Sequence, residues 1–128
     1  MISQIYGGGG NTGATYRNDF IEIFNAGNQV VNLSGWSVQY TAAGGTTWQV
    51  TNLTAFNLQP GQYYLIQEAQ GAGGTTNLPT PDATGTIAMA ATAGKVALLD
   101  TTTALSGGGC PIGANVKAFV GYGTGTTC

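Results

Sequence analysis

Two stretches of sequence decide the fold, namely DFIEIFN at residues 19–25 and VNLSGWSV at residues 31–38. The first alternates its side chains over the length of a strand, and the Gly27-Asn28 pair behind it predicts a turn. The second joins a Ser-Gly turn to Trp36, where a new strand is expected to begin. A large indole at that position can anchor a core between two packed sheets. Both stretches predict short β-strands.

The rest of the chain repeats this alternation of strand and turn. Glycine-rich runs at 7–10, 71–74 and 107–109 separate strand-like segments, and no window combines helix caps with a helical period. This pattern predicts an all-β protein, a sandwich or a barrel. The expected strands cover residues 2–6, 19–25, 36–40, 48–53, 63–67, 86–89, 95–100 and 115–122.

Alternation also predicts which side chains face the core. In the strand at 19–25, Ile21 and Ile23 share one face, which leaves Phe20, Glu22 and Phe24 on the other. Two apolar faces in one strand indicate a central strand covered on both sides, or a face that meets something else. Burial of each large apolar side chain contributes about 1.5–3 kcal/mol. The predicted core anchors are Trp36, Val38, Ile21, Ile23 and Leu65.

Alternation predicts the faces of two further strands in the same way. Between 36 and 40, Ser37 and Gln39 are expected on the face opposite the core. Between 48 and 53, Trp48 and Val50 are expected to point inward and to alternate with Gln49 and Thr51.

Length and charge limit the function classes. The 128 residues suit one domain, residues 1–128, with a single core. Three basic and five acidic residues give a net charge of −2, so the basic surface that nucleic-acid binding requires is absent. No apolar run approaches the roughly 20 residues that span a bilayer. We therefore expect neither a nucleic-acid partner nor membrane insertion.

Catalysis is not expected. The sequence has no histidine, which excludes Ser-His-Asp and Cys-His arrangements. Glu22 with Asp19 or with Glu68 are the only carboxylate pairs that could hydrolyse a glycoside, and Asp19 and Glu22 project to opposite faces of their strand. The four-glycine run lacks both a following helix and a Gly-Lys-Ser/Thr ending, so no phosphate-bearing cofactor is expected.

A metal site is not predicted either. Calcium needs several converging oxygen ligands, and the best candidates are Asn11, Asn18, Asp19 and Glu22, with Asp82 on a proline-rich loop as another. The alternative is that these are ordinary solvated side chains.

The two cysteines predict a disulfide. Cys110 and Cys128 bracket one expected strand, and a bridge would close a loop of roughly 15 to 20 residues, worth about 3 kcal/mol. Two unpaired buried thiols are the alternative. A bridge persists only in an oxidising compartment, which predicts an extracellular or cell-surface location. A strand-like segment follows Met1 without a signal peptide, so either the protein stays inside the cell or the chain is a domain excised from a larger protein. The two cysteines favour an excised domain.

An ordered set of motifs carries a family resemblance. It comprises ISQIY at 2–6, DFIEIFN at 19–25, NLSGWSV at 32–38, LQPGQYYL at 58–65, LPTPD at 78–82, GKVAL at 94–98 and FVGYG at 119–123. This set resembles the bacterial branch of the lamin tail domain family. The resemblance implies an immunoglobulin-like sandwich of two sheets. It also implies an extracellular module that binds or tethers and is appended to nuclease, phosphatase or adhesion domains.

Two functions follow as hypotheses. The first is a noncatalytic binding or tethering module with weak protein or carbohydrate contacts, in which Trp48, Tyr16 and Tyr122 could stack on sugar rings if exposed. Core packing is the alternative role for these aromatics. The second is a structural spacer or self-assembly domain. Family domains often continue into a further strand, and its absence here would leave an edge able to form a homodimer.

Overall fold

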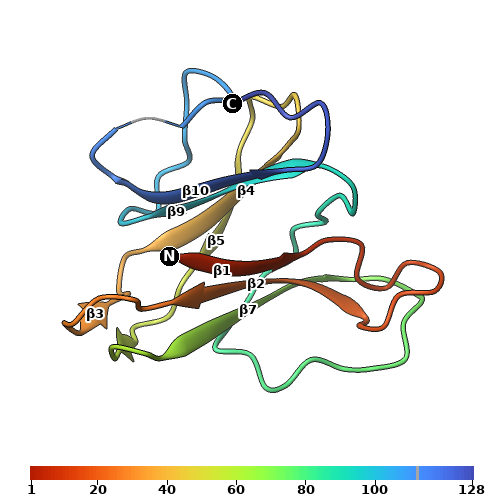
Figure 1. The fold of residues 1–128 in the computed structure, drawn as a ribbon, viewed down its shortest axis with the longest axis horizontal. Helices are drawn as coiled ribbons and strands as arrows, with labels where there is room; N and C mark the ends of the chain where they lie inside the picture. Colours follow the sequence, from red (N-terminus) through yellow and green to blue (C-terminus); the bar gives the residue numbers. More distant parts are fainter. Residues whose placement is uncertain (112) are drawn as a thin grey trace.

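The computed structural model describes residues 1–111 and 113–128, and its described residues form strands and loops without a helix. The strands alternate with turns along the whole chain (Figure 1), as the sequence predicts. Their bounds are β1 Ile2–Tyr6, β2 Asn18–Phe24, β3 Val31–Asn32, β4 Ser37–Ala42, β5 Gln49–Asn52, β6 Asn57–Leu58, β7 Tyr63–Gln70, β8 Ala83–Thr84, β9 Gly94–Leu99 and β10 Val116–Tyr122.

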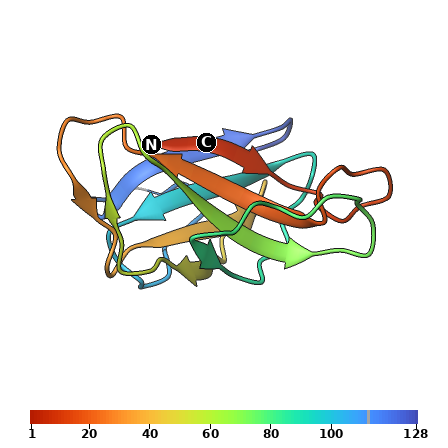
Figure 2. The same ribbon diagram turned by 90° about the horizontal axis from the view of Figure 1, so that it is seen from below.

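The strands form an immunoglobulin-like sandwich of two sheets. One sheet has the order β1-β2-β7-β8 and the other β10-β9-β4-β5, while β3 and β6 pair as a small ribbon. All pairs are antiparallel except β7 with β8. Figures 1 and 2 show the two layers from two directions, with the β3 ribbon at one end.

The main core lies between the sheets. Ile21, Ile23 and Val38 are buried there. Leu65 is only half-buried, because Tyr64 and Ile66 take the inward positions on β7. The predicted core role of Leu65 is therefore wrong.

Trp36 also differs from its predicted place. It precedes β4 instead of opening it, and its half-buried side chain packs against the edge of the core. Its backbone N–H donates to the Leu33 carbonyl in a tight turn, so the indole lies at one end of the sandwich.

A second, smaller core covers the outer face of β4, β5 and β9. Trp48, Ala97 and Leu99 pack there against Leu105, Val116 and Phe119. Thr51, and not Val50, faces the other sheet, where its hydroxyl bonds Glu68. The expectation that Val50 points inward was wrong, since Trp48 and Val50 share the outer face.

The segment that follows β9 buries polar side chains of β4 on this outer face. Ser37 donates to the Thr101 carbonyl at 2.6 Å, and Gln39 donates to the Thr103 carbonyl at 2.9 Å. The Leu105 N–H in turn donates to the Gln39 side chain at 2.9 Å. Buried polar groups need such partners, and a long loop supplies them here.

The predicted strand at 86–89 is not a strand. Ile87 and Met89 insert between the sheets, whereas the neighbouring Ala88 is exposed. The Met89 N–H donates to Asp19 at 2.7 Å and the Ile87 N–H to Glu68 at 3.4 Å. Side-chain carboxylates therefore accept from the N–H groups of this alternating segment. Its carbonyls accept from backbone, Ile87 from the Ala69 N–H of β7 at 3.0 Å and Met89 from the Gly8 N–H at 3.3 Å.

Two glycine-rich loops pack backbone against backbone. A Cβ at Gly10 would collide with the backbone of Gly71. The Gly73 N–H donates to the Gly10 carbonyl at 2.6 Å. The four-glycine run thus serves close approach of two chain segments, which is a structural role.

Candidate binding site

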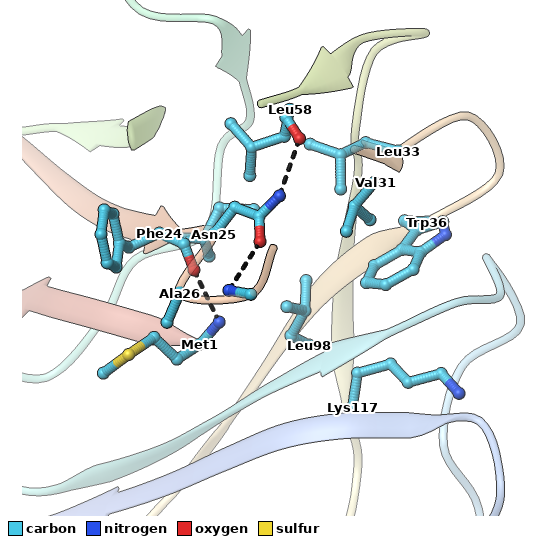
Figure 3. Close-up of a pocket in the computed structure, with 12 residues that line it drawn as sticks. Met1, Phe24, Asn25, Ala26, Val31, Leu33, Trp36, Leu58, Leu98 and Lys117 are labelled. Carbon is cyan, nitrogen blue, oxygen red and sulfur yellow. Dashed lines mark hydrogen bonds between the residues drawn. The ribbon is translucent and has the colours of Figure 1, made fainter. Parts of the chain in front are cut away.

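A pocket of about 200 Å³ opens at the end of the sandwich beside the β3 ribbon. Its lining includes one core side chain from each sheet, Ile23 of β2 and Leu98 of β9, together with Val31 of β3. Figure 3 shows Leu98 and Val31 near one another in this pocket. The remaining lining residues are Met1, Phe24, Asn25, Ala26, Gly27, Leu33, Trp36, Leu58 and Lys117. A recess of this size suits one large side chain of a partner and is smaller than the usual site for a small-molecule ligand.

Asn25 fixes the wall of this pocket. Its amide donates to the carbonyls of Leu58 and Gln29, at 2.9 and 2.8 Å, and its side-chain oxygen accepts from the Gly27 N–H at 3.0 Å. Because the side chain is buried and its bonds hold the 25–29 turn against β6, the pocket is preformed. The Asn25-x-Gly27 spacing, typical of an Asx-turn, is the one sequence signal that could have located it.

Large apolar side chains are exposed on or next to the segments that line the pocket, and Met1, a lining residue, is 60% exposed. Tyr63 is 57% exposed and its ring lies 4.6 Å from that of Phe24, a lining residue. Val30 is 50% exposed and precedes the lining residue Val31. We call the pocket together with Val30, Phe24, Trp36 and Tyr63 the apolar end. Phe24 and Tyr63 lie on the outer face of their sheet, because the neighbouring Ile23 and Tyr64 face the core. Exposed apolar side chains on segments that line an apolar pocket are candidates for an interaction site.

Trp36 and Lys117 flank the pocket on the β10 side. Figure 3 shows the indole with its nitrogen directed away from Asn25 and Val31, so its carbon edge faces the recess. The Lys117 ammonium lies 3.3 Å from Asp100, which neutralises it. The apolar end therefore offers apolar contact and aromatic surface. Its charges are Lys117, paired with Asp100, and the Met1 ammonium, which donates to the Phe24 carbonyl at 2.8 Å.

A second group of ionisable side chains lies in the interior of the sandwich. Asp19 and Glu68 are both buried, and burial raises the pKa of each, that of Glu68 to about 7. Thr51 donates to both oxygens of Glu68 at 2.9 Å, and the Gly9 N–H donates to Asp19 at 2.6 Å. With 1% and 3% exposure, neither carboxylate reaches a substrate. The pair holds the segment at 87–89 in place.

The aromatics proposed for sugar stacking do not form a platform. Trp48 is 5% exposed and donates its indole N–H to the Gly108 carbonyl. Tyr16 packs edge-on against Tyr6 and Phe20. Tyr122 donates its hydroxyl to the Ala90 carbonyl at 2.7 Å. All three are tied into the fold, and the exposed aromatic surface lies instead at Tyr63.

The candidate calcium ligands are not brought together. Asp19 is buried and bonded to backbone N–H groups, whereas Glu22 accepts from Ser3 on the outer face of β2. Asn18 donates to the Glu68 carbonyl, and Asp82 accepts from the Leu65 N–H. Among the described residues, no group of three or more acidic or cysteine side chains is placed to hold a metal ion.

The disulfide joins Cys110 to Cys128, as predicted, with their Cα atoms 5.8 Å apart. Beside it the buried Lys95 ammonium donates to the Gly109 carbonyl at 2.9 Å and the Thr127 hydroxyl at 3.1 Å. The bridge and the lysine together fasten the residues after β10 to the loop before it.

A comparison with family models identifies the fold's relatives. The model described as Lamin Tail Domain matches residues 1–112. The chain belongs to the lamin tail domain family. Lamin tail domains are generally noncatalytic and immunoglobulin-like, which agrees with the sandwich described above. The comparison with curated proteins finds no match. In the part of the chain that the structure describes, no helix is long and apolar enough to cross a membrane.

Proposed function

We propose that this lamin tail domain is a noncatalytic binding or tethering module of a secreted or cell-surface bacterial protein. Its contact surface is the apolar end, and its ligand is a protein. The observation that carries the proposal is the preformed apolar pocket, with the exposed side chains of Met1, Val30 and Tyr63 on or next to the segments that line it. Large aromatic side chains in such positions dominate the energetics of protein interfaces.

The disulfide supports the proposed location. A bridge between Cys110 and Cys128 supports an oxidising environment outside the cytoplasm. The affinity of the isolated domain is expected to be weak, because a recess of about 200 Å³ buries little surface compared with a standard protein interface.

Carbohydrate is the second candidate ligand. The Phe24 and Tyr63 rings, 4.6 Å apart and tilted by 32°, form an exposed aromatic surface on which a sugar ring can pack. The pocket is lined mainly by apolar groups and offers few hydrogen-bond donors to sugar hydroxyls. This lining favours a protein ligand over a carbohydrate.

The test compares Tyr63→Ser and Val30→Ser with Gln49→Ala, a control at an exposed position on β5. Binding to immobilised cell-surface proteins and to a polysaccharide panel is measured by biolayer interferometry. We expect the first two variants to lose at least tenfold in affinity while the control binds like the parent chain. Equal binding by all three variants would refute the assignment of the apolar end. Tyr63-dependent binding to polysaccharide alone would favour the second candidate.

A further inference from the structure

The open edges of the two sheets lie along the same side of the sandwich. β1 is the edge of one sheet and β10 the edge of the other, and Figures 1 and 2 both show them running in the same direction. Among the described residues, β1 pairs only with β2 and β10 only with β9. Each therefore presents backbone N–H and C=O groups outside the sheets, a template for a further strand. At the end of β10 the Tyr122 carbonyl accepts from the Thr126 hydroxyl at 2.6 Å, so the free edge of β10 is the part before Tyr122.

Two hollows follow one another along the space between these strands, which we call the seam. The pocket of the apolar end includes Met1, before β1, and Lys117, early in β10. A second hollow of about 200 Å³ lies further along both strands. It is lined by Ile2, Ser3, Gln4, Ile5, Val120 and Tyr122. Successive side chains on one face of a strand repeat every 6.5–7 Å or so, so neighbouring hollows suit alternate residues of an extended segment.

The seam carries few charges. β1 has no charged side chain, and β10 has only Lys117, which is paired with Asp100. The Met1 ammonium donates to the Phe24 carbonyl at 2.8 Å, and Glu22 of β2 accepts from the Ser3 hydroxyl at 2.9 Å. Natural edge strands are commonly protected by charges that discourage pairing. An edge without this protection, with apolar hollows beside it, matches a peptide that has uncharged apolar residues at alternate positions.

We infer that the seam binds an extended segment of a partner protein, which adds as a strand to the free edge of β10 and places alternate apolar side chains in the two hollows. This inference rests on the proposed function, since it specifies the kind of protein that the module binds. β10 is the better template because it has seven residues against five in β1. Its register is also regular from Ala118 to Tyr122. Backbone hydrogen bonds supply affinity in this mode of recognition, and the hollows supply specificity.

The probes are synthetic octapeptides in which Leu or Val alternates with Thr. A peptide of the same composition with its apolar residues consecutive is the sequence control. Two further versions of the best binder carry N-methyl groups on alternate amides, one version in each register. Only one register points its N–H groups at β10, so we expect one version to lose at least tenfold in affinity and the other to bind normally. Hydrogen exchange should show new protection of β10 amides when the peptide is bound.

A matched pair of variants tests the edge in the full chain. Val120→Asp places a charge on β10, and Val50→Asp places the same charge on β5, the other edge of that sheet; both valines are half-buried. We expect peptide binding to fall at least tenfold in the first and to persist in the second. Val120→Thr, which preserves side-chain shape, provides a milder variant if Val120→Asp unfolds.

Several results would overturn the inference. These are the absence of binding by every alternating peptide at 1 mM, equal binding by both N-methylated versions, and protection that appears on β1 or β5 instead of β10. If β10 amides become protected from hydrogen exchange as the protein concentration rises, in the absence of peptide, the edge binds a second copy of this chain instead. If Tyr63→Ser abolishes binding but N-methylation of the peptide has no effect, the proposed function is supported. In that case only the inference of an added strand is wrong.

Discussion

Asp19 and Glu68, from β2 and β7, bind alternate N–H groups of one extended segment, those of Met89 and Ile87. The segment lies between the sheets with Ile87 and Met89 buried. The two carboxylates thus accept the N–H hydrogen bonds that a neighbouring strand would otherwise accept. Because both carboxylates are buried, the pKa of each is raised. Their ionisation is therefore coupled to folding.

Stability should fall as the pH rises through neutrality. Burial raises the pKa of Glu68 from 4.5 to about 7, so between these values the folded state binds a proton that the unfolded state has released. Stability from this group is complete below about pH 4.5 and is lost as the pH passes 7. The loss is about 3 kcal/mol at most, and Asp19 acts in the same direction. Urea unfolding at pH 5 and pH 8.5 measures it.

The control for this pH effect is another glutamate. Glu68→Gln keeps the acceptor oxygen for Thr51 and should flatten the pH dependence, while Glu22→Gln, on the outer face of β2, should preserve it. Parent stability that increases from pH 5 to pH 8.5 would contradict the prediction.

The two tryptophans should contribute unequally to the free energy of unfolding. The sequence predicts Trp36 as a core anchor, but Trp48 should contribute more. Trp48 is 5% exposed and donates a hydrogen bond through its indole, so Trp48→Ala should cost about 3–5 kcal/mol. Trp36 is half-buried beside an open pocket, so Trp36→Ala should cost clearly less, about 1–2 kcal/mol. Chemical denaturation of both variants measures the difference, and a larger cost at position 36 would be inconsistent with this structure.

Gly10→Ala should be strongly destabilising. A Cβ there collides with the Gly71 backbone, and φ is +77°. Gly13 has φ of +84° with nothing within 4 Å of its Cβ position. Gly13→Ala should therefore lower the free energy of unfolding by only about 1–2 kcal/mol, the cost of placing a residue with a Cβ in the left-handed backbone region. Thermal melts should place Gly10→Ala well below Gly13→Ala, and equal melting temperatures would disprove close packing of the two loops.

Removal of the disulfide should cost about 3 kcal/mol for a loop of this length, since the bonded cysteines are 18 residues apart. Replacing Cys110 and Cys128 together by Ser is the variant, and reduction of the parent chain should give the same loss. Thiol titration of unfolded, unreduced protein should detect no free thiol. Two reactive thiols would contradict both the bridge and the extracellular proposal.

Local sequence determined the class of fold and most of its strands. Period-2 alternation and glycine-rich turns predict β1, β2, β7 and β10 within a few residues, because both signals act between neighbours in the chain. β3 and β6 have two residues each, which is too short for an alternating pattern to be recognised. The segment at 86–89 alternates as a strand does, but its N–H groups donate to carboxylates distant in sequence instead of to a neighbouring strand.

Tertiary structure decided which face of each strand is covered. Alternation separates the two faces of β4 but does not reveal that residues 101–105 bury Ser37 and Gln39. It likewise cannot place Leu65 outward, since Tyr64, Leu65 and Ile66 are all apolar. The apolar end and the seam arise where distant segments meet, at Asn25 with Leu58 and along β1 beside β10. Such contacts depend on the path of the whole chain, whereas a strand depends only on its own few residues.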